Sequence, residues 1–179
     1  MNRPNRRRVL AATGAALTAG LAGCTGGGDG GDTDGGDGGG DGGSDGGGPS
    51  LEVPSEARTR IDDFLTAEPS ASNYDGSIAA AGDATVEVGV EGNQGFFAFG
   101  PAAIAVEQGT TVNWEWTGKG NRHNVVSTND SDFQLDSGDP KQEDSYKFTF
   151  EEPGVALYHC IPHKSLGMKG AVAVVASSG

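Results

Sequence analysis

The sequence YHCIPHKSLGMKGAVAVV occupies residues 158–175 and combines a strand-like run with a crowd of metal-binding side chains. Two of the three histidines, one of the two cysteines and the only methionine besides Met1 lie between His159 and Met168. Cys160, His163 and Met168 follow the spacing Cys-x-x-His-x-x-x-x-Met. A soft thiolate, an imidazole and a thioether in one short loop favour copper. The stretch therefore predicts a metal site that follows directly on a strand.

The sequence upstream has the period-two alternation of β-strands. Apolar residues alternate with polar ones in ATVEVGVE (84–91), TVNWEW (111–116) and SYKFTF (145–150). Further strand-like runs are FFAF (96–99), AIAVE (103–107), HNVVS (123–127), VALYHC (155–160) and AVAVVA (171–176), with Gly- and Pro-containing turns between them. Many short strands at close intervals predict an all-β fold, an antiparallel β-sandwich or barrel with Greek-key connections.

A mononuclear blue copper site needs a second imidazole besides that of His163. It has two histidines and a cysteine in one plane and a weak axial methionine. Setting His159 aside, the remaining histidine is His123, which follows a Gly-rich turn and precedes a strand. Taken singly, His123 reads as a surface histidine, Met168 as core filler and Cys160 as an inert buried thiol. Their combination with His163 favours copper over these alternatives.

Three stretches resemble cupredoxins of the plastocyanin type: FxFGPAAIAVEQGTTVNWEW (97–116), HNVV (123–126) and the opening stretch. The resemblance covers roughly residues 73–176. It implies one type 1 copper ion with His123, Cys160 and His163 as strong equatorial ligands and Met168 as the weak axial ligand. It also implies that Asn124 hydrogen-bonds the loop that carries the cysteine, although an asparagine here could simply favour a turn.

The first fifty residues predict export and a lipid anchor. Residues 1–23 have a basic start and a short apolar run, and Arg6 and Arg7 favour a twin-arginine signal over ordinary Sec export. The sequence LAGC resembles a lipobox, which implies lipidation of Cys24, whereas the alternative is a chance cysteine in a signal cut elsewhere. We therefore expect an exported protein held by membrane lipid at the outer face of the cell membrane.

Two segments separate Cys24 from the copper domain that we expect at 81–179. The remainder of 24–50 is nearly all Gly and Asp and predicts a disordered linker. Residues 51–80 predict a short helix and an arm. Over 55–67, Ser55 is a capping candidate, and Ile61, Phe64 and Leu65 share one face. This helix either docks on the domain or belongs to a mobile arm.

The formal charge of −13 argues against nucleic acid as a partner, because phosphate binding needs a basic surface. The same charge favours a soluble monomer, and its excess of acidic residues suits a very salty medium. With the anchor and the linker added, the resemblance extends to the small blue copper proteins of halophilic archaea.

The predicted function is single-electron transfer between redox partners, with no catalysed reaction. The partners would be transient, membrane-bound or soluble redox proteins of a respiratory chain. We expect the electron to leave through the outer edge of His163, which is surrounded by Ile161, Pro162 and Leu166. His159 is either a second exit or only an exposed histidine.

Copper delivery or storage at the outer membrane face is the alternative function. A copper oxidase or nitrite-reducing enzyme would need additional copper sites, and three histidines are too few for them.

Overall fold

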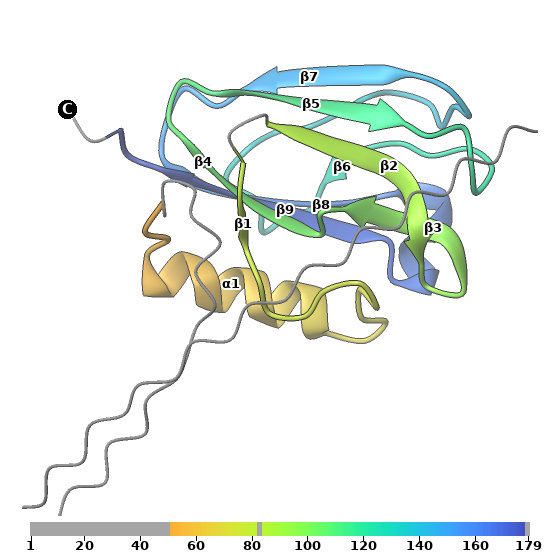
Figure 1. Cartoon of the computed structure of the whole chain (residues 1–179), viewed down its shortest axis with the longest axis horizontal. Coiled ribbons are helices and arrows are strands. Elements are labelled where there is room, and N and C mark those ends of the chain that lie inside the picture. The colour runs from red at the N-terminus through yellow and green to blue at the C-terminus, as the bar shows by residue number, and fades with distance from the viewer. Residues whose placement is uncertain (1–50, 82–83, 178–179) are drawn as a thin grey trace, which may run out of the picture. The chain divides into compact units, whose positions relative to one another are not determined.

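The computed structural model describes residues 51–81 and 84–177. The expected signal (1–23), the expected lipid site at Cys24 and the Gly/Asp linker lie outside these residues. The described chain forms two stacked β-sheets with one helix, α1, against the outer face of one of them (Figure 1). Within it, no helix is long and apolar enough to cross a membrane. The predicted all-β sandwich is confirmed.

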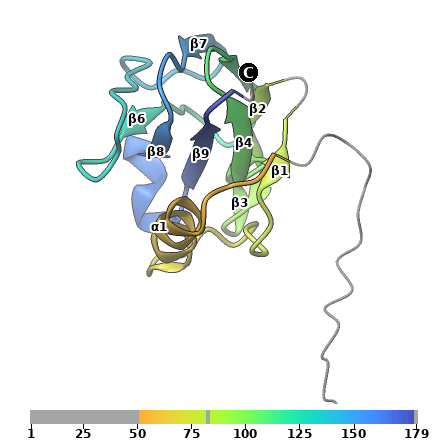
Figure 2. The ribbon, with the colours of Figure 1, turned by 90° about the vertical axis from the view of Figure 1, so that its left-hand side faces the viewer.

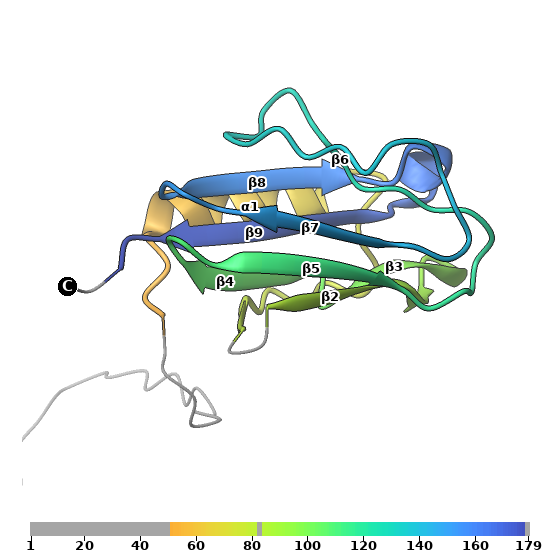
Figure 3. The same cartoon turned by 90° about the horizontal axis from the view of Figure 1, so that it is seen from above.

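One sheet has the strand order β1-β4-β9-β8-β6 and the other β3-β2-β5-β7 (Figure 3). The elements are α1 (Ser55–Thr66), β1 (Ala79–Ala80), β2 (Thr85–Gly92), β3 (Gly95–Gly100), β4 (Ala103–Glu107), β5 (Thr111–Trp116), β6 (Val126–Ser127), β7 (Ser145–Thr149), β8 (Gly154–His159), a 3-10 helix η1 (Ile161–Leu166) and β9 (Lys169–Val175).

The prediction that the sheets are antiparallel was wrong. The pairs β1–β4, β2–β5 and β4–β9 are parallel, and the remaining pairs are antiparallel, so both sheets are mixed. The cause lies in the connections. Some consecutive strands, such as β4 and β5, belong to different sheets. Strands paired in parallel, such as β4 and β9, are therefore joined by a crossover instead of a hairpin.

The predicted strand runs are found, with three differences. HNVVS forms only the two-residue strand β6, and β1 had no sequence signal. Val90 is partly exposed, whereas Val86 and Val88 are fully buried, because the pairing of β2 with β3 shifts between Val88 and Val90. Gly89 lies in that bulge with φ +88°, and a Cβ there would meet the Lys119 carbonyl oxygen at 2.7 Å.

The five-stranded sheet is apolar on both faces because each face has its own core. In β4, the bulky Ile104 and Val106 point into the sandwich, and Ala103 and Ala105 point toward α1. Strand β9 repeats the pattern with valines on the sandwich side and alanines on the helix side. Small residues on the outer face allow the helix backbone to approach closely, which explains why VALYHC and AVAVVA lack a polar face.

Helix α1 docks on this alanine-rich face, which decides between the two alternatives left by the sequence (Figure 2). Ile61 and Leu65 are fully buried against the sheet, and each such burial stabilises the fold by about 1.5–3 kcal/mol. The predicted capping role of Ser55 was wrong. Pro54 precedes the helix, no side chain caps it, and Ser55 is already its first residue.

Candidate metal centre

Three of the four predicted ligands lie in the connection between two paired strands. Strand β8 ends at His159, Cys160 follows, and η1 leads to Met168, the residue directly before β9. Figure 3 shows η1 joining the ends of β8 and β9. The Cys160 N–H donates to the Met168 carbonyl at 3.1 Å, and the Met168 N–H donates to the His163 carbonyl at 3.2 Å. These bonds close the connection, which we call the ligand loop (residues 160–168), on itself. Met168 is fully buried within it.

His123 reaches the same place from the opposite direction in sequence. Its backbone exchanges two hydrogen bonds with Lys141, at 2.8 and 2.9 Å, and its side chain is fully buried. The ring Nε2 lies 2.8 Å from the Lys119 carbonyl oxygen. Because a carbonyl can only accept, the ring proton belongs on Nε2, and Nδ1 keeps its lone pair. That lone pair is available to a metal.

The three donor atoms converge. The His123 and His163 Nδ1 atoms are 3.1 Å apart, and Cys160 Sγ lies 3.7 Å from the first and 3.4 Å from the second. A point equidistant from all three lies about 2 Å from each, close to the usual metal–imidazole and metal–thiolate bond lengths. The donor set and its spacing fit a copper ion.

Burial favours the uncharged form of each donor. It raises the pKa of the Cys160 thiol, an effect opposed by hydrogen bonds from the backbone of Asn124 and of His163. Burial lowers the pKa of His123. For His163, burial and the nearby His123 both lower the pKa. A metal needs neutral imidazoles and a thiolate, so binding would release the thiol proton.

Asn124 and Phe97 hold the centre from outside. The buried Asn124 accepts a hydrogen bond from the Ile161 N–H at 2.9 Å and donates one to the Gly138 carbonyl at 3.1 Å. The Phe97 ring lies 4.6 Å from the His163 ring, centroid to centroid. In the sequence, Phe97 belongs to a strand-like run and to the stretch that resembles cupredoxins, but no local pattern indicated its contact with His163.

The ligand loop exposes apolar side chains, and Lys164 and Ser165 are exposed beside them. Ile161 and Leu166 are 48% and 42% exposed, Pro162 is exposed, and His163 is partly exposed among them. His159 is half-buried, and burial together with nearby Lys164 lowers its pKa.

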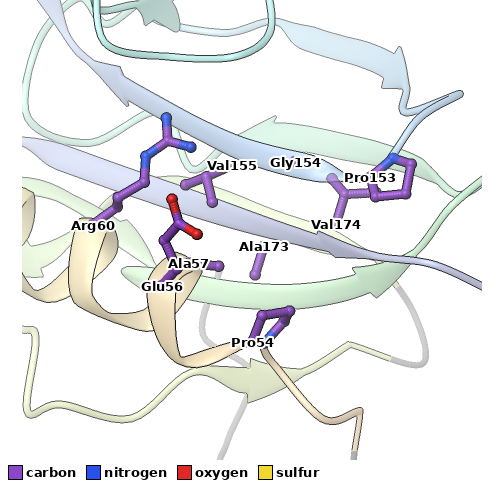
Figure 4. Close-up of a pocket in the computed structure, with 9 residues that line it drawn as sticks. All are labelled: Pro54, Glu56, Ala57, Arg60, Pro153, Gly154, Val155, Ala173 and Val174. Carbon is purple, nitrogen blue, oxygen red and sulfur yellow. The ribbon is translucent and has the colours of Figure 1, made fainter.

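A separate cavity of about 300 Å³ lies between α1 and the beginning of β8 (Figure 4). Glu56, Arg60 and Val155 are among its lining residues. Since β8 runs from Gly154 here to His159 beside the ligand loop, this cavity lies at the other end of the strand from the donors.

Comparisons with known proteins identify relatives of this chain among copper-binding proteins. Residues 84–175 match the family described as copper binding proteins, plastocyanin/azurin family. A halocyanin from Natronomonas pharaonis is 49% identical over 175 residues, which is 95% of this chain and 97% of that protein. A chloroplastic plastocyanin from Physcomitrium patens is 36% identical over 105 residues, covering 54% of this chain and 61% of that one. The oxidised plastocyanin structure from Dryopteris crassirhizoma has a TM-score of 0.42 and 31% identity, and it covers 51% of this chain and all of that one.

Proposed function

This chain belongs to the plastocyanin/azurin family of copper-binding proteins, and on that premise we propose that it shuttles single electrons between redox partners while attached to a membrane. The expected copper cofactor and the resemblance to blue copper cupredoxins are confirmed by this family match and the halocyanin relative. In this proposal His123, Cys160 and His163 would hold the copper ion, with Met168 as a fourth and weaker ligand. The observation that carries it is the convergence of three donor atoms within 3.7 Å of one another.

Bound copper supplies a couple that takes up and gives back one electron. The chain's own residues keep the donors in place through that cycle. Lys119 fixes the ring of His123 through its carbonyl, and Asn124 ties the ligand loop beside Cys160. The complete burial of His123 and Cys160 excludes water from that side. Donors that hardly move need little reorganisation when the charge changes.

The proposed exit for the electron is the outer edge of His163. Its apolar surroundings at Ile161, Pro162 and Leu166 offer a small contact surface for redox proteins that bind and leave quickly. His159 is proposed as a second exit on the adjoining strand.

The membrane attachment and the location rest on the sequence of the first fifty residues. We propose export by the signal at 1–23, lipidation of Cys24 and a monomer tethered to the outer face of the membrane by the Gly/Asp linker. Membrane-bound or soluble respiratory proteins would be its partners. In cells that make the full chain, wild-type protein should partition into detergent and a Cys24→Ser variant into the aqueous phase. Equal partitioning would contradict the anchor.

Cysteine substitution combined with spectroscopy tests the copper centre itself. Copper(II)-loaded full chain should show an intense blue band and unusually narrow copper hyperfine splitting in the electron paramagnetic resonance spectrum. Cys160→Ser should lose both features, whereas the matched variant Cys24→Ser should keep them. A pale spectrum that does not change in Cys160→Ser would refute the ligand set.

Electron transfer and copper delivery predict different kinetics. A carrier should release copper slowly and undergo fast, reversible reduction. Rapid exchange of copper with a chelator, without reversible reduction, would instead support delivery or storage.

A further inference from the structure

A buried lysine joins the ligand loop to the N-terminal helix. Lys169 follows Met168 directly and is only 8% exposed. Its Nζ donates hydrogen bonds to the carbonyls of Phe64, at 3.0 Å, and Ala67, at 2.7 Å, and lies 5.2 Å from the centroid of the Phe64 ring. These carbonyls belong to the C-terminal end of α1, where backbone acceptors lack helical partners and a cation is favoured.

The arm after α1 also contacts the ligand loop directly. Gly167 lies in the left-handed region with φ +92°, and a Cβ there would be 2.1 Å from the Ser70 carbonyl oxygen. Two hydrogen bonds hold the arm from its other side. The Asn93 N–H donates to Ser72 Oγ at 2.6 Å, and the Ser72 N–H donates to Asn93 Oδ1 at 2.9 Å. Asn93 itself is 5% exposed, in the turn between β2 and β3. The arm is therefore held between this turn and the loop.

We propose that α1 and the arm at 67–74 form a brace that positions the ligand loop, and that Lys169 is the positioning residue that joins the two. The inference rests on the proposed function, because it assigns this segment a role in keeping His163 and Met168 in place. The brace lies outside residues 84–175, the part of the chain that matches the copper-binding family. It is an addition to the shared copper domain.

Opening of the ligand loop must break the brace. The backbone of Lys169 is fixed in the sheet by its pairing with His159. Its side chain therefore links the C-terminal end of α1 to the backbone next to Met168. Without the two hydrogen bonds of Lys169, the ligand loop would open locally more often, while the strands of the sandwich would stay paired.

A second attachment of α1, in the middle of the helix, provides a matched control. Arg60 binds Asp132 through two hydrogen bonds, at 2.7 and 3.0 Å, and the Asp130 carbonyl at 2.7 Å. It ties the same helix to the domain near Val155, away from the ligand loop. Arg60→Met and Lys169→Met remove the same charge from two attachments of one helix, and only the second attachment adjoins the copper ligands.

Amide hydrogen exchange in the metal-free full chain is the test. In Lys169→Met, the amides of Cys160, Gly167 and Met168 should exchange about tenfold faster than in the wild type, because two buried hydrogen bonds no longer oppose opening. Amides of β5 should not change. Lys169→Arg, which keeps the charge and the donors, should restore slow exchange. Arg60→Met should leave the loop amides at the wild-type rate.

The copper-loaded protein gives a second measurement. Lys169→Met should release copper to a chelator several-fold faster and show a broadened copper(II) resonance, and Lys169→Arg should reverse both effects. Should Lys169→Met fail to fold, Ser72→Ala loosens the arm from the opposite side and should accelerate the same loop amides.

Wild-type exchange of the loop amides in Lys169→Met, or equal acceleration in Arg60→Met, would overturn the brace. Because exchange is measured without copper, this result is separate from the loss of the blue spectrum in Cys160→Ser, which tests the proposed function.

Discussion

Replacement of Asn124 by alanine should destabilise the protein through one specific loss. The side chain is 1% exposed and accepts the Ile161 N–H at 2.9 Å. In Asn124→Ala this amide loses its partner, at a cost of about 1–3 kcal/mol. The second bond, to the Gly138 carbonyl at 3.1 Å, is lost as well. We expect a loss of about 2 kcal/mol, which lowers the Tm by about 6–12 °C in a domain of this size.

The measurement is thermal unfolding of the metal-free full chain, followed by circular dichroism, so that copper binding does not contribute to stability. Asn129→Ala is the control, because Asn129 is an exposed asparagine in a turn and its loss should change stability by less than about 0.5 kcal/mol. If Asn124→Ala unfolded at the same temperature as Asn129→Ala, the assignment of Asn124 as a tie to the ligand loop would be wrong.

Three further predictions concern the helix, a surface ion pair and the second exit. Ile61→Ala should lower the free energy of unfolding by about 2–5 kcal/mol in urea titrations, because Ile61 is fully buried on the face of α1 that packs on the sheet. An unchanged midpoint would mean that the packing of the helix does not contribute to stability. Arg60 lowers the pKa of the Asp132 carboxyl in the folded protein. The ion pair therefore stabilises the fold above the unfolded-state pKa of about 3.9. This stabilisation is lost as the pH falls through the lower pKa of the folded state. Asp132→Asn should therefore lower the free energy of unfolding by less than about 1 kcal/mol at pH 7, since both side chains of the pair are partly exposed. Well below a pH of about 3.9 the variant and the wild type should be equally stable. A difference in stability that persisted in acid would contradict the linkage. His159→Ala should leave the blue band intact and slow the reaction with one class of redox partner, and equal rates with every partner would remove the second exit.

Sequence patterns predicted the strands well because side-chain alternation is a local property. TVNWEW coincides with β5, and the other alternating runs overlap β2 and β7. Pairing direction is not local. Whether β2 lies parallel to β5 depends on where the chain crosses between the sheets, and no single strand carries that information. The same limit applies to Val90, which leaves the core because of the bulge at Gly89.

The sequence by itself determined which residues could form the metal centre. Cys160, His163 and Met168 are close in the chain, so a single loop brings them together, and His123 was the one histidine left to complete the donors. Only the tertiary structure decided how the centre is held. The Lys119 carbonyl selects the free nitrogen of His123, and Lys169 bonds Ala67 across 102 positions of sequence. Contacts of this kind depend on how separate elements pack in three dimensions, and a spacing along the chain does not record that packing.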